Sequence, residues 1–206
     1  MPRVSEEHLE RRRRQILDAA RTCFVRKGFH QTSMQDVFTE SGLSAGAVYR
    51  YFKSKDELVL ALAASAGGNI QARMQEAIDR DPLPTPAELV SHMTEWIAAQ
   101  AGPEGQLRLA PQAWSLALID DEVAAPVRET LAGVRGRWRD YAERMLAAGW
   151  LPADADLDAV AGALFGLLPG FVLQQLVIGN VDRDQFSRGV DTLLPFGTAR
   201  TPTKPD

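Results

Sequence analysis

The sequence predicts an all-α protein in which a small N-terminal domain of three helices shares one further helix with a larger helical domain. Two observations support this prediction. Helix-forming residues dominate the 206-residue chain, and no alternating strand pattern is sustained anywhere. A chain of this length also accommodates one small and one medium domain, which fits the division that the motifs below indicate.

The first helix is expected over about residues 5–27, because Ile16, Ala19, Ala20, Cys23 and Phe24 fall on one face at helical spacing. Cys23 is the single cysteine, so an intrachain disulfide is excluded and a reducing compartment is favoured. The charged N-terminus lacks the apolar core of a signal peptide. We therefore expect a cytoplasmic protein.

Residues 32–52, TSMQDVFTESGLSAGAVYRYF, have the pattern of a helix-turn-helix motif. Ser33 is placed to cap the first of its helices, with Asp36 as the capping-box partner. Gly42 supplies a turn that needs positive φ, and Ser44 is placed to cap the second helix. The second helix then opens on small residues only, so its backbone N–H groups can approach a phosphate or a base edge.

Three stretches of the N-terminal region together resemble the TetR-type (TetR/AcrR) transcriptional regulators: RRRRQILDAARTCFVRKGFHQTS, SGLSAGAVYRYF and KSKDELVLAL, covering about residues 10–62. The resemblance implies a dimeric, ligand-responsive regulator, most often a repressor, that binds a palindromic operator in double-stranded DNA. It also implies that Lys55 contacts a DNA phosphate. Tyr51 stands where many members carry histidine, which keeps a hydrogen-bonding group but removes any charge.

Arg50 lies between two aromatic residues of the second helix, where its side chain can bond a guanine edge through two hydrogen bonds. The hydroxyls and N–H groups that open the preceding helix suit a backbone phosphate. One or two residues of the run Arg11–Arg14 either touch phosphate or form a solvated helix start. The expected DNA-binding residues are Thr32, Ser33, Gln35, Ser44, Ala45, Gly46, Ala47, Tyr49, Arg50, Tyr51 and Lys55.

The charge distribution separates the two ends of the chain. Residues 1–55 hold eleven Lys or Arg against six Asp or Glu, a net of +5, within a chain whose net charge is −4. The remaining residues therefore carry a net of −9. A basic N-terminal part favours a polyanion as its partner, whereas an acidic remainder would be repelled by one.

A fourth helix should start at a capping box of Ser54 and Glu57 and run to about residue 79, linking the two domains. Gly67 and Gly68 mark a possible bend in it. Further helices are expected at about 86–101, 106–119, 121–149, 156–179 and 183–195. We expect a DNA-binding domain at 10–70, an effector-binding and dimerisation domain at 71–196, and a disordered tail at 197–206.

Residues 160–173, VAGALFGLLPGFVL, are apolar without interruption, but Gln174 and Gln175 stop the run and acidic residues flank it. We expect a buried helix rather than a membrane span, and no membrane partner. Gly162, Gly166 and Gly170 share one face of this helix and allow another helix to approach closely. That helix either belongs to the same chain or, as the resemblance implies, to the second subunit of a four-helix dimer interface.

The larger domain contains all four tryptophans, and aromatic residues there either line a cavity for an apolar or partly aromatic effector or form an ordinary core. Two polar residues on one helix could orient such an effector. The candidate effector-binding residues are Trp96, Arg108, Gln112, Trp114, Trp138, Phe165 and Phe171.

Other kinds of site find no support in the sequence. His8, His30 and His92 are scattered, so no metal site is expected. The chain shows no nucleophile elbow, phosphate-binding glycine loop or catalytic carboxylate pair, so we expect neither enzymatic activity nor a cofactor. Two alternatives to a DNA-binding regulator are a helical carrier of small molecules with an incidental basic head, and a helical enzyme that uses the C-terminal cavity.

Overall fold

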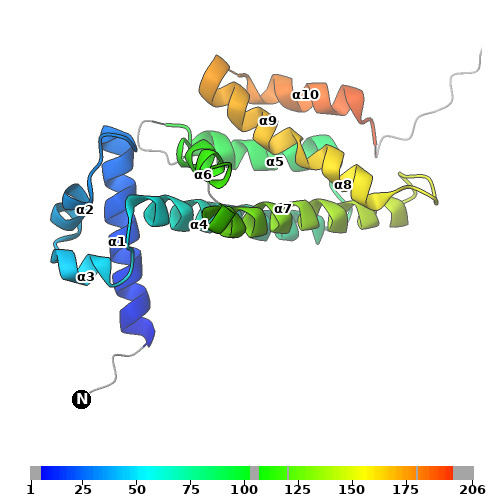
Figure 1. Ribbon diagram of the computed structural model, residues 1–206. Coiled ribbons are helices and arrows are strands. Elements are labelled where there is room, and N and C mark those ends of the chain that lie inside the picture. The colour runs from blue at the N-terminus through cyan, green and yellow to red at the C-terminus, as the bar shows by residue number, and fades with distance from the viewer. Residues whose placement is uncertain (1–5, 103–106, 120, 180, 197–206) are drawn as a thin grey trace, which may run out of the picture. The chain divides into compact units, whose positions relative to one another are not determined.

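The computed structural model describes residues 6–102, 107–119, 121–179 and 181–196, and all of their regular elements are helices (Figure 1). The predicted all-α class is therefore confirmed. The chain divides into two compact units: Met1–Gly68 with Ala99–Leu131, and Asn69–Ala98 with Ala132–Asp206. Two long helices, α4 (Lys55–Ile78) and α7 (Asp121–Ala147), contribute to both units.

The first unit contains α1 (Glu6–Lys27), α2 (Met34–Ser41), α3 (Ala45–Tyr49), α6 (Leu109–Ala117) and the N-terminal parts of α4 and α7. The apolar stripe predicted for α1 is buried, and it packs in one cluster with residues of α2 and α3 such as Val37 and Val48. Leu109 and Ala113 of α6 belong to the same cluster. Residues 99–131, which we expected in the larger domain, thus group with the helix-turn-helix.

The helix α4 is continuous through Gly67 and Gly68. A Cβ atom at Gly67 would overlap the methyl group of Thr130 in α7. The absence of a side chain at this position therefore lets the two long helices approach closely within the first unit.

The second unit contains α5 (Pro86–Ala99), α8 (Leu157–Phe165), α9 (Leu167–Leu173), a π-helical turn η1 (Gln174–Ile178), α10 (Arg183–Leu193) and the C-terminal parts of α4 and α7. Side chains of α7 hold the end of α4 and the loop that follows it. The Tyr141 hydroxyl donates to the Pro84 carbonyl at 2.6 Å, and Arg144 donates to the carbonyls of Ile78 and Arg80 at 2.5 and 3.2 Å. Burial raises the pKa of the Tyr141 hydroxyl, so this side chain stays a neutral donor.

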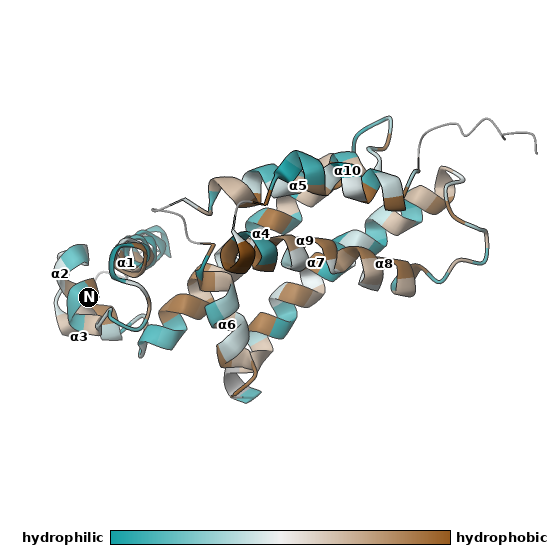
Figure 2. Cartoon of the chain, turned by 90° about the horizontal axis from the view of Figure 1, so that it is seen from above, coloured by the Kyte–Doolittle hydropathy of each residue, from teal (hydrophilic) through white to brown (hydrophobic). Residues whose placement is uncertain are grey.

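The helix expected at 156–179 is interrupted. Gly166 separates α8 from α9, and α9 passes into the π-helical turn η1. The helical run Leu157–Ile178 is long and apolar enough to cross a membrane by length and composition, and Figure 2 shows the hydropathy along it. Within this run, 28% of an apolar 18-residue window is buried. The expected buried helix is therefore only partly confirmed: within residues 160–173, Gly162, Ala163, Gly166 and Leu173 are exposed and the other residues are buried or half-buried.

The expected domain boundary near residue 70 lies close to the point where α4 passes between the units, at Gly68 and Asn69. The expected disordered tail, residues 197–206, lies outside the described residues.

Candidate nucleic-acid interface

The first helix of the helix-turn-helix begins at the predicted capping box. The Ser33 side chain accepts from the Asp36 N–H at 3.3 Å, and Asp36 Oδ2 accepts from the Ser33 N–H at 2.8 Å. Lys27 Nζ lies 2.6 Å from Asp36 Oδ1. The hydrogen bonds from Lys27 and then from Ser33 hold the pKa of Asp36 well below its usual range. This carboxylate therefore stays ionised and fixes the start of α2 against the end of α1.

The turn between α2 and α3 has the geometry that the sequence predicts. Gly42 adopts φ 66° and ψ 20°, and its N–H donates to carbonyls of the last turn of α2. The Leu43 N–H donates to the Phe38 carbonyl at 3.3 Å, as in a helix end closed by a left-handed glycine. Ser44 then caps α3 by accepting from the Ala47 N–H at 3.3 Å.

The apolar side chains in and just after α3 point into the protein core, whereas its candidate DNA-contacting residues point outward. Val48 is fully buried, and Phe52 just beyond the helix is 4% exposed. Tyr49 is 41% exposed and packs edge-on against Phe38, with 5.3 Å between ring centroids. Arg50 is exposed, and a Cβ atom at Gly46 would have no neighbour within 4 Å. The opening turn and the Arg50 side chain are thus accessible to a partner.

Two predicted phosphate contacts are used inside the protein. Thr32 is 2% exposed, and its hydroxyl lies 2.8 Å from the Gly28 carbonyl oxygen and 3.2 Å from that of Cys23. Lys55 Nζ donates to the carbonyls of Phe29 and Thr32 at 2.8 and 3.0 Å, and lies 4.3 Å from the Phe29 ring centroid. Thr32 therefore ties the α1–α2 corner to the end of α1, and Lys55 ties the same corner to the start of α4, functions that local sequence signals do not reveal.

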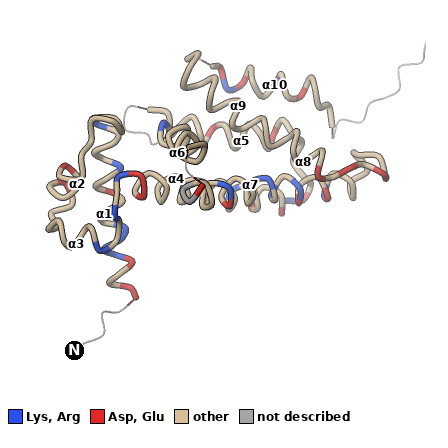
Figure 3. The backbone as a smooth tube through the Cα atoms, in the orientation of Figure 1, with Lys and Arg blue, Asp and Glu red and all other residues tan. Residues whose placement is uncertain are grey.

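The remaining predicted DNA-binding residues lie on the outside of the motif to different degrees. Ala47 and Tyr51 are half-buried. The exposed members are Ser33, Gln35, Ser44, Ala45, Gly46, Tyr49 and Arg50. Lys and Arg residues also lie along the N-terminal half of α1 and on the segment between α3 and α4 (Figure 3).

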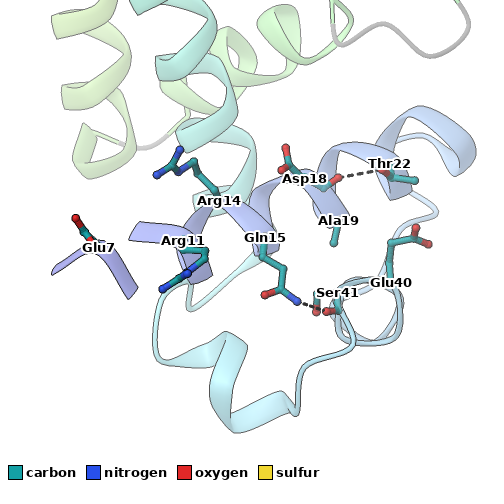
Figure 4. A pocket seen from close by; sticks show the side chains of 9 residues that line it. All are labelled: Glu7, Arg11, Arg14, Gln15, Asp18, Ala19, Thr22, Glu40 and Ser41. Atoms are coloured by element: carbon teal, nitrogen blue, oxygen red, sulfur yellow. Dashed lines mark hydrogen bonds between the residues drawn. The ribbon is translucent and has the colours of Figure 1, made fainter. Parts of the chain in front are cut away.

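A shallow hollow between α1 and α2 is a feature that the sequence did not indicate (Figure 4). Gln15 Nε2 donates to the Ser41 carbonyl at 2.8 Å across it. Side chains of both charge signs surround this contact. The lining residues are Glu7, Arg11, Arg14, Gln15, Asp18, Ala19, Thr22, Glu40 and Ser41. Helical spacing along α1 places most of them on one face, which is the signal that could have identified the hollow.

The candidate effector residues divide between the two units. Trp138 and Phe171 are fully buried in the second unit, and the Trp138 indole N–H has no acceptor among the described residues. Trp96 is half-buried, with the Arg73 guanidinium 5.4 Å from its ring centroid. Phe165 is half-buried in the same unit. The other three candidates, in the first unit, are the exposed Arg108 and the half-buried Gln112 and Trp114.

The three glycines predicted at a subunit interface lie on α8 and α9. Gly162 and Gly166 are exposed and Gly170 is half-buried. Large apolar side chains are exposed further along the same run: Leu173 (46%), Val177 (78%) and Ile178 (74%). Much of this helical run therefore lacks a covering partner within the described parts of the chain.

Comparison with known proteins agrees with the geometry of the motif. Residues 16–62 match the family described as bacterial regulatory proteins, tetR family. The chain is 53% identical over 57 residues to an uncharacterized HTH-type transcriptional regulator, YfiR, of Bacillus subtilis, which covers 28% of each chain. It is 35% identical over 115 residues to the HTH-type transcriptional repressor Rv1474c of Mycobacterium tuberculosis, covering 54% of this chain and 59% of that one. These two matches thus span less than two thirds of the relatives.

Longer but more distant matches extend over nearly the whole chain. The HTH-type transcriptional repressor AcnR of Corynebacterium diphtheriae is 28% identical over 199 residues, covering 93% of this chain and 94% of that one. A solved structure of a putative transcriptional regulator from Pseudomonas aeruginosa has a TM-score of 0.70 at 24% identity, covering 94% of each chain. The regulator FadR from Bacillus subtilis, solved in complex with stearoyl-CoA, has a TM-score of 0.67 at 21% identity, covering 90% of this chain and 98% of that one. These structures share the fold with the chain.

Proposed function

Because residues 16–62 make this chain a member of the tetR family of bacterial regulatory proteins, we propose that it is a ligand-responsive repressor that binds a palindromic operator as a dimer. The observation that carries the proposal is the capped helix-turn-helix, with a small-residue opening turn and an exposed Arg50. Relatives named as transcriptional repressors support repression as the outcome of binding. The family consists of regulators, and we propose that this member works in the cytoplasm without enzymatic activity.

In the proposed complex, Arg50 and the backbone surface of Ala45–Ala47 read base edges in the major groove. Ser33, Gln35, Ser44, Tyr49 and Tyr51 contact the sugar-phosphate backbone and fix the register. Thr32 and Lys55 shape the same surface by holding the corner between α1 and α2. Lys55 also brings its positive charge to this corner, so its predicted phosphate contact remains part of the proposal.

The exposed apolar helix supports the proposed dimer. We propose that α8, α9 and η1 pack with α10 against the same elements of a second copy, with Gly162, Gly166 and Gly170 at the closest approach. The outward Leu173, Val177 and Ile178 then leave water. A two-fold dimer presents two copies of α3 to half-sites about one helical turn of DNA apart, or a small multiple of that distance.

The proposed effector binds in the second unit and is apolar or partly aromatic. Burying an N–H without an acceptor costs about 1–3 kcal/mol. The Trp138 indole N–H is such a donor, so an effector with a carbonyl or hydroxyl oxygen would satisfy it. The structural neighbour FadR was solved with stearoyl-CoA, a molecule that combines an apolar chain with a carbonyl group. We propose that the effector weakens DNA binding, because it favours one of two states of the dimer.

The test is to select duplexes from a random library with the full chain, and then to titrate the enriched duplex at several salt concentrations. We expect an inverted-repeat sequence and an affinity that falls steeply with salt. Chains that retain small apolar ligands but enrich no DNA sequence would instead be helical carrier proteins. A hydrolysed or modified ligand recovered from the C-terminal unit would support the enzyme alternative.

A further inference from the structure

We propose that Arg13 is a DNA-phosphate contact, held in place by the aromatic ring of Phe52 beside the end of α3. This inference rests on the proposed function, because it takes DNA as the partner. It selects one arginine from the run Arg11–Arg14, whose members differ in their surroundings although they are identical in charge.

Successive residues of an α-helix lie about 100° apart, so four consecutive arginines cannot face one partner. Arg13 precedes Leu17, Ala20 and Phe24 at intervals of four, three and four residues. These three residues are buried in the cluster that joins α1 to the helix-turn-helix. Arg13 thus continues the stripe that packs on the DNA-reading motif, with its guanidinium at the solvent edge.

The guanidinium carbon of Arg13 lies 5.4 Å from the centroid of the Phe52 ring. Phe52 is 4% exposed, and its N–H donates to the Val48 carbonyl at 3.0 Å, which ties the ring to α3. Stacking uses the flat face of a guanidinium and leaves the N–H groups at its edge able to donate to an anion. A side chain held in this way also loses less rotamer entropy on binding than a freely moving one.

The neighbouring arginines have other surroundings. Arg12 donates to the Gln15 side chain at 2.8 Å, and Arg14 lies 3.6 Å from the Glu10 carboxylate. Arg11 and Arg14 line the hollow of Figure 4 together with the carboxylates of Glu7, Asp18 and Glu40. These acidic groups would repel a phosphate brought to that face. Among the described residues Arg13 forms no ion pair, so its positive charge is available to an external anion.

The experiment compares Arg13→Gln with the matched control Arg11→Gln in the full-length chain. Each protein is titrated with the selected duplex and with an unselected duplex of equal length, over a series of salt concentrations. For each DNA phosphate that the variant no longer neutralises, the slope of log affinity against log salt should become shallower by about 0.9, or about 2 for a dimer. We expect Arg13→Gln to show this change, and an affinity loss of about tenfold on both duplexes.

Arg11→Gln should keep the wild-type slope and stay within about twofold in affinity. Arg13→Lys, which keeps the charge but loses the planar fork, should retain the slope and bind with intermediate affinity. Thermal melting of each variant checks that the fold is intact. An unchanged slope for Arg13→Gln, or an equal change for Arg11→Gln, would overturn the assignment. If the wild-type chain binds neither duplex, the proposed DNA-binding function is wrong, and so is the inference about Arg13 that depends on it.

Discussion

The helix-turn-helix and the helical run Leu157–Ile178 differ in where their stabilising partners lie. The first has its caps and turn within a few residues of each other: Ser33 with Asp36, Gly42 with Phe38, and Ser44 with Ala47. The second is predominantly apolar, yet Val177 and Ile178 are 78% and 74% exposed. Local hydrogen bonds therefore define the helix starts and the turn of the DNA-reading motif, whereas the described residues of the chain leave part of the helical run uncovered.

The largest effect is expected from a substitution that disrupts the proposed subunit interface. Gly166→Asp would place an unpaired charge in the proposed subunit interface, which costs several kcal/mol. We expect the dimer dissociation constant to rise by at least about 100-fold, as measured by sedimentation. Gly136→Asp in α7 is the control, because a Cβ atom at Gly136 has no neighbour within 4 Å, whereas at Gly166 the nearest atom is the Ala163 carbonyl oxygen at 3.4 Å, an ordinary contact. A Gly166→Asp protein that stays dimeric at low micromolar concentration would place this face elsewhere than at the interface.

The next effect concerns base reading by α3. Arg50→Ala should cost about 1–3 kcal/mol on the selected duplex and relax the preference at one base position. Lys55→Ala should weaken binding to all duplexes alike, because its ammonium supports the corner and the backbone contact rather than a base. Competition titrations with single-base variants of the duplex measure both outcomes. Equal losses of Arg50→Ala on selected and unselected DNA would exclude a base-reading role.

A smaller effect is expected on the stability of the helix-turn-helix, where alanine substitutions at Gly42 and Gly46 should act in opposite directions. Gly42→Ala puts a side chain at φ 66°, which should lower the free energy of unfolding by about 1–2 kcal/mol. Gly46→Ala lies inside α3 with open space around it, so helix propensity should raise stability by a fraction of about 1 kcal/mol. Urea unfolding compares the two variants. The same substitution at Gly46 should nevertheless weaken DNA binding, because the added methyl group faces the groove.

The smallest effect should be the pH dependence of the Asp36 cap. The pKa of Asp36 is lowered in the folded chain, so its stabilising contribution is present above the unfolded value of about 3.9 and is lost as pH falls towards the folded value. Asp36→Asn should therefore be less stable than wild type at pH 7, and the difference should shrink below about pH 4. Urea midpoints of both proteins across this range test the claim. A difference that stays constant down to about pH 2.5 would contradict it.

Much of the DNA-reading motif was predictable because its signals are local. A capping serine acts on an N–H three residues away, and a left-handed glycine closes the helix that it ends. The predicted caps at Ser33 and Ser44 and the turn at Gly42 are confirmed for this reason. The outward-facing site residues of α3 are predictable in the same way, since helical spacing places them on the face opposite the buried Val48.

Contacts between residues distant in sequence were not predictable from local patterns. The Lys55 ammonium bonds carbonyls that lie 26 and 23 residues earlier, and Arg13 meets the ring of Phe52 from a different helix. Leu109 of α6 joins the core of the helix-turn-helix although it lies 57 residues beyond Phe52, the end of that motif (109 − 52). Such pairs depend on how helices pack, and many alternative partners satisfy the same hydrophobic pattern.

The sequence by itself thus determined the helical class, the capped motif and the basic N-terminal end, because composition, spacing and capping act over a few residues. Only the tertiary structure decided that Thr32 is turned inward, that the expected helix 156–179 is interrupted at Gly166, and which residues of that run face outward. The physical reason is that burial depends on which surfaces meet. An apolar residue looks the same in the sequence whether its own chain or a second chain covers its side chain.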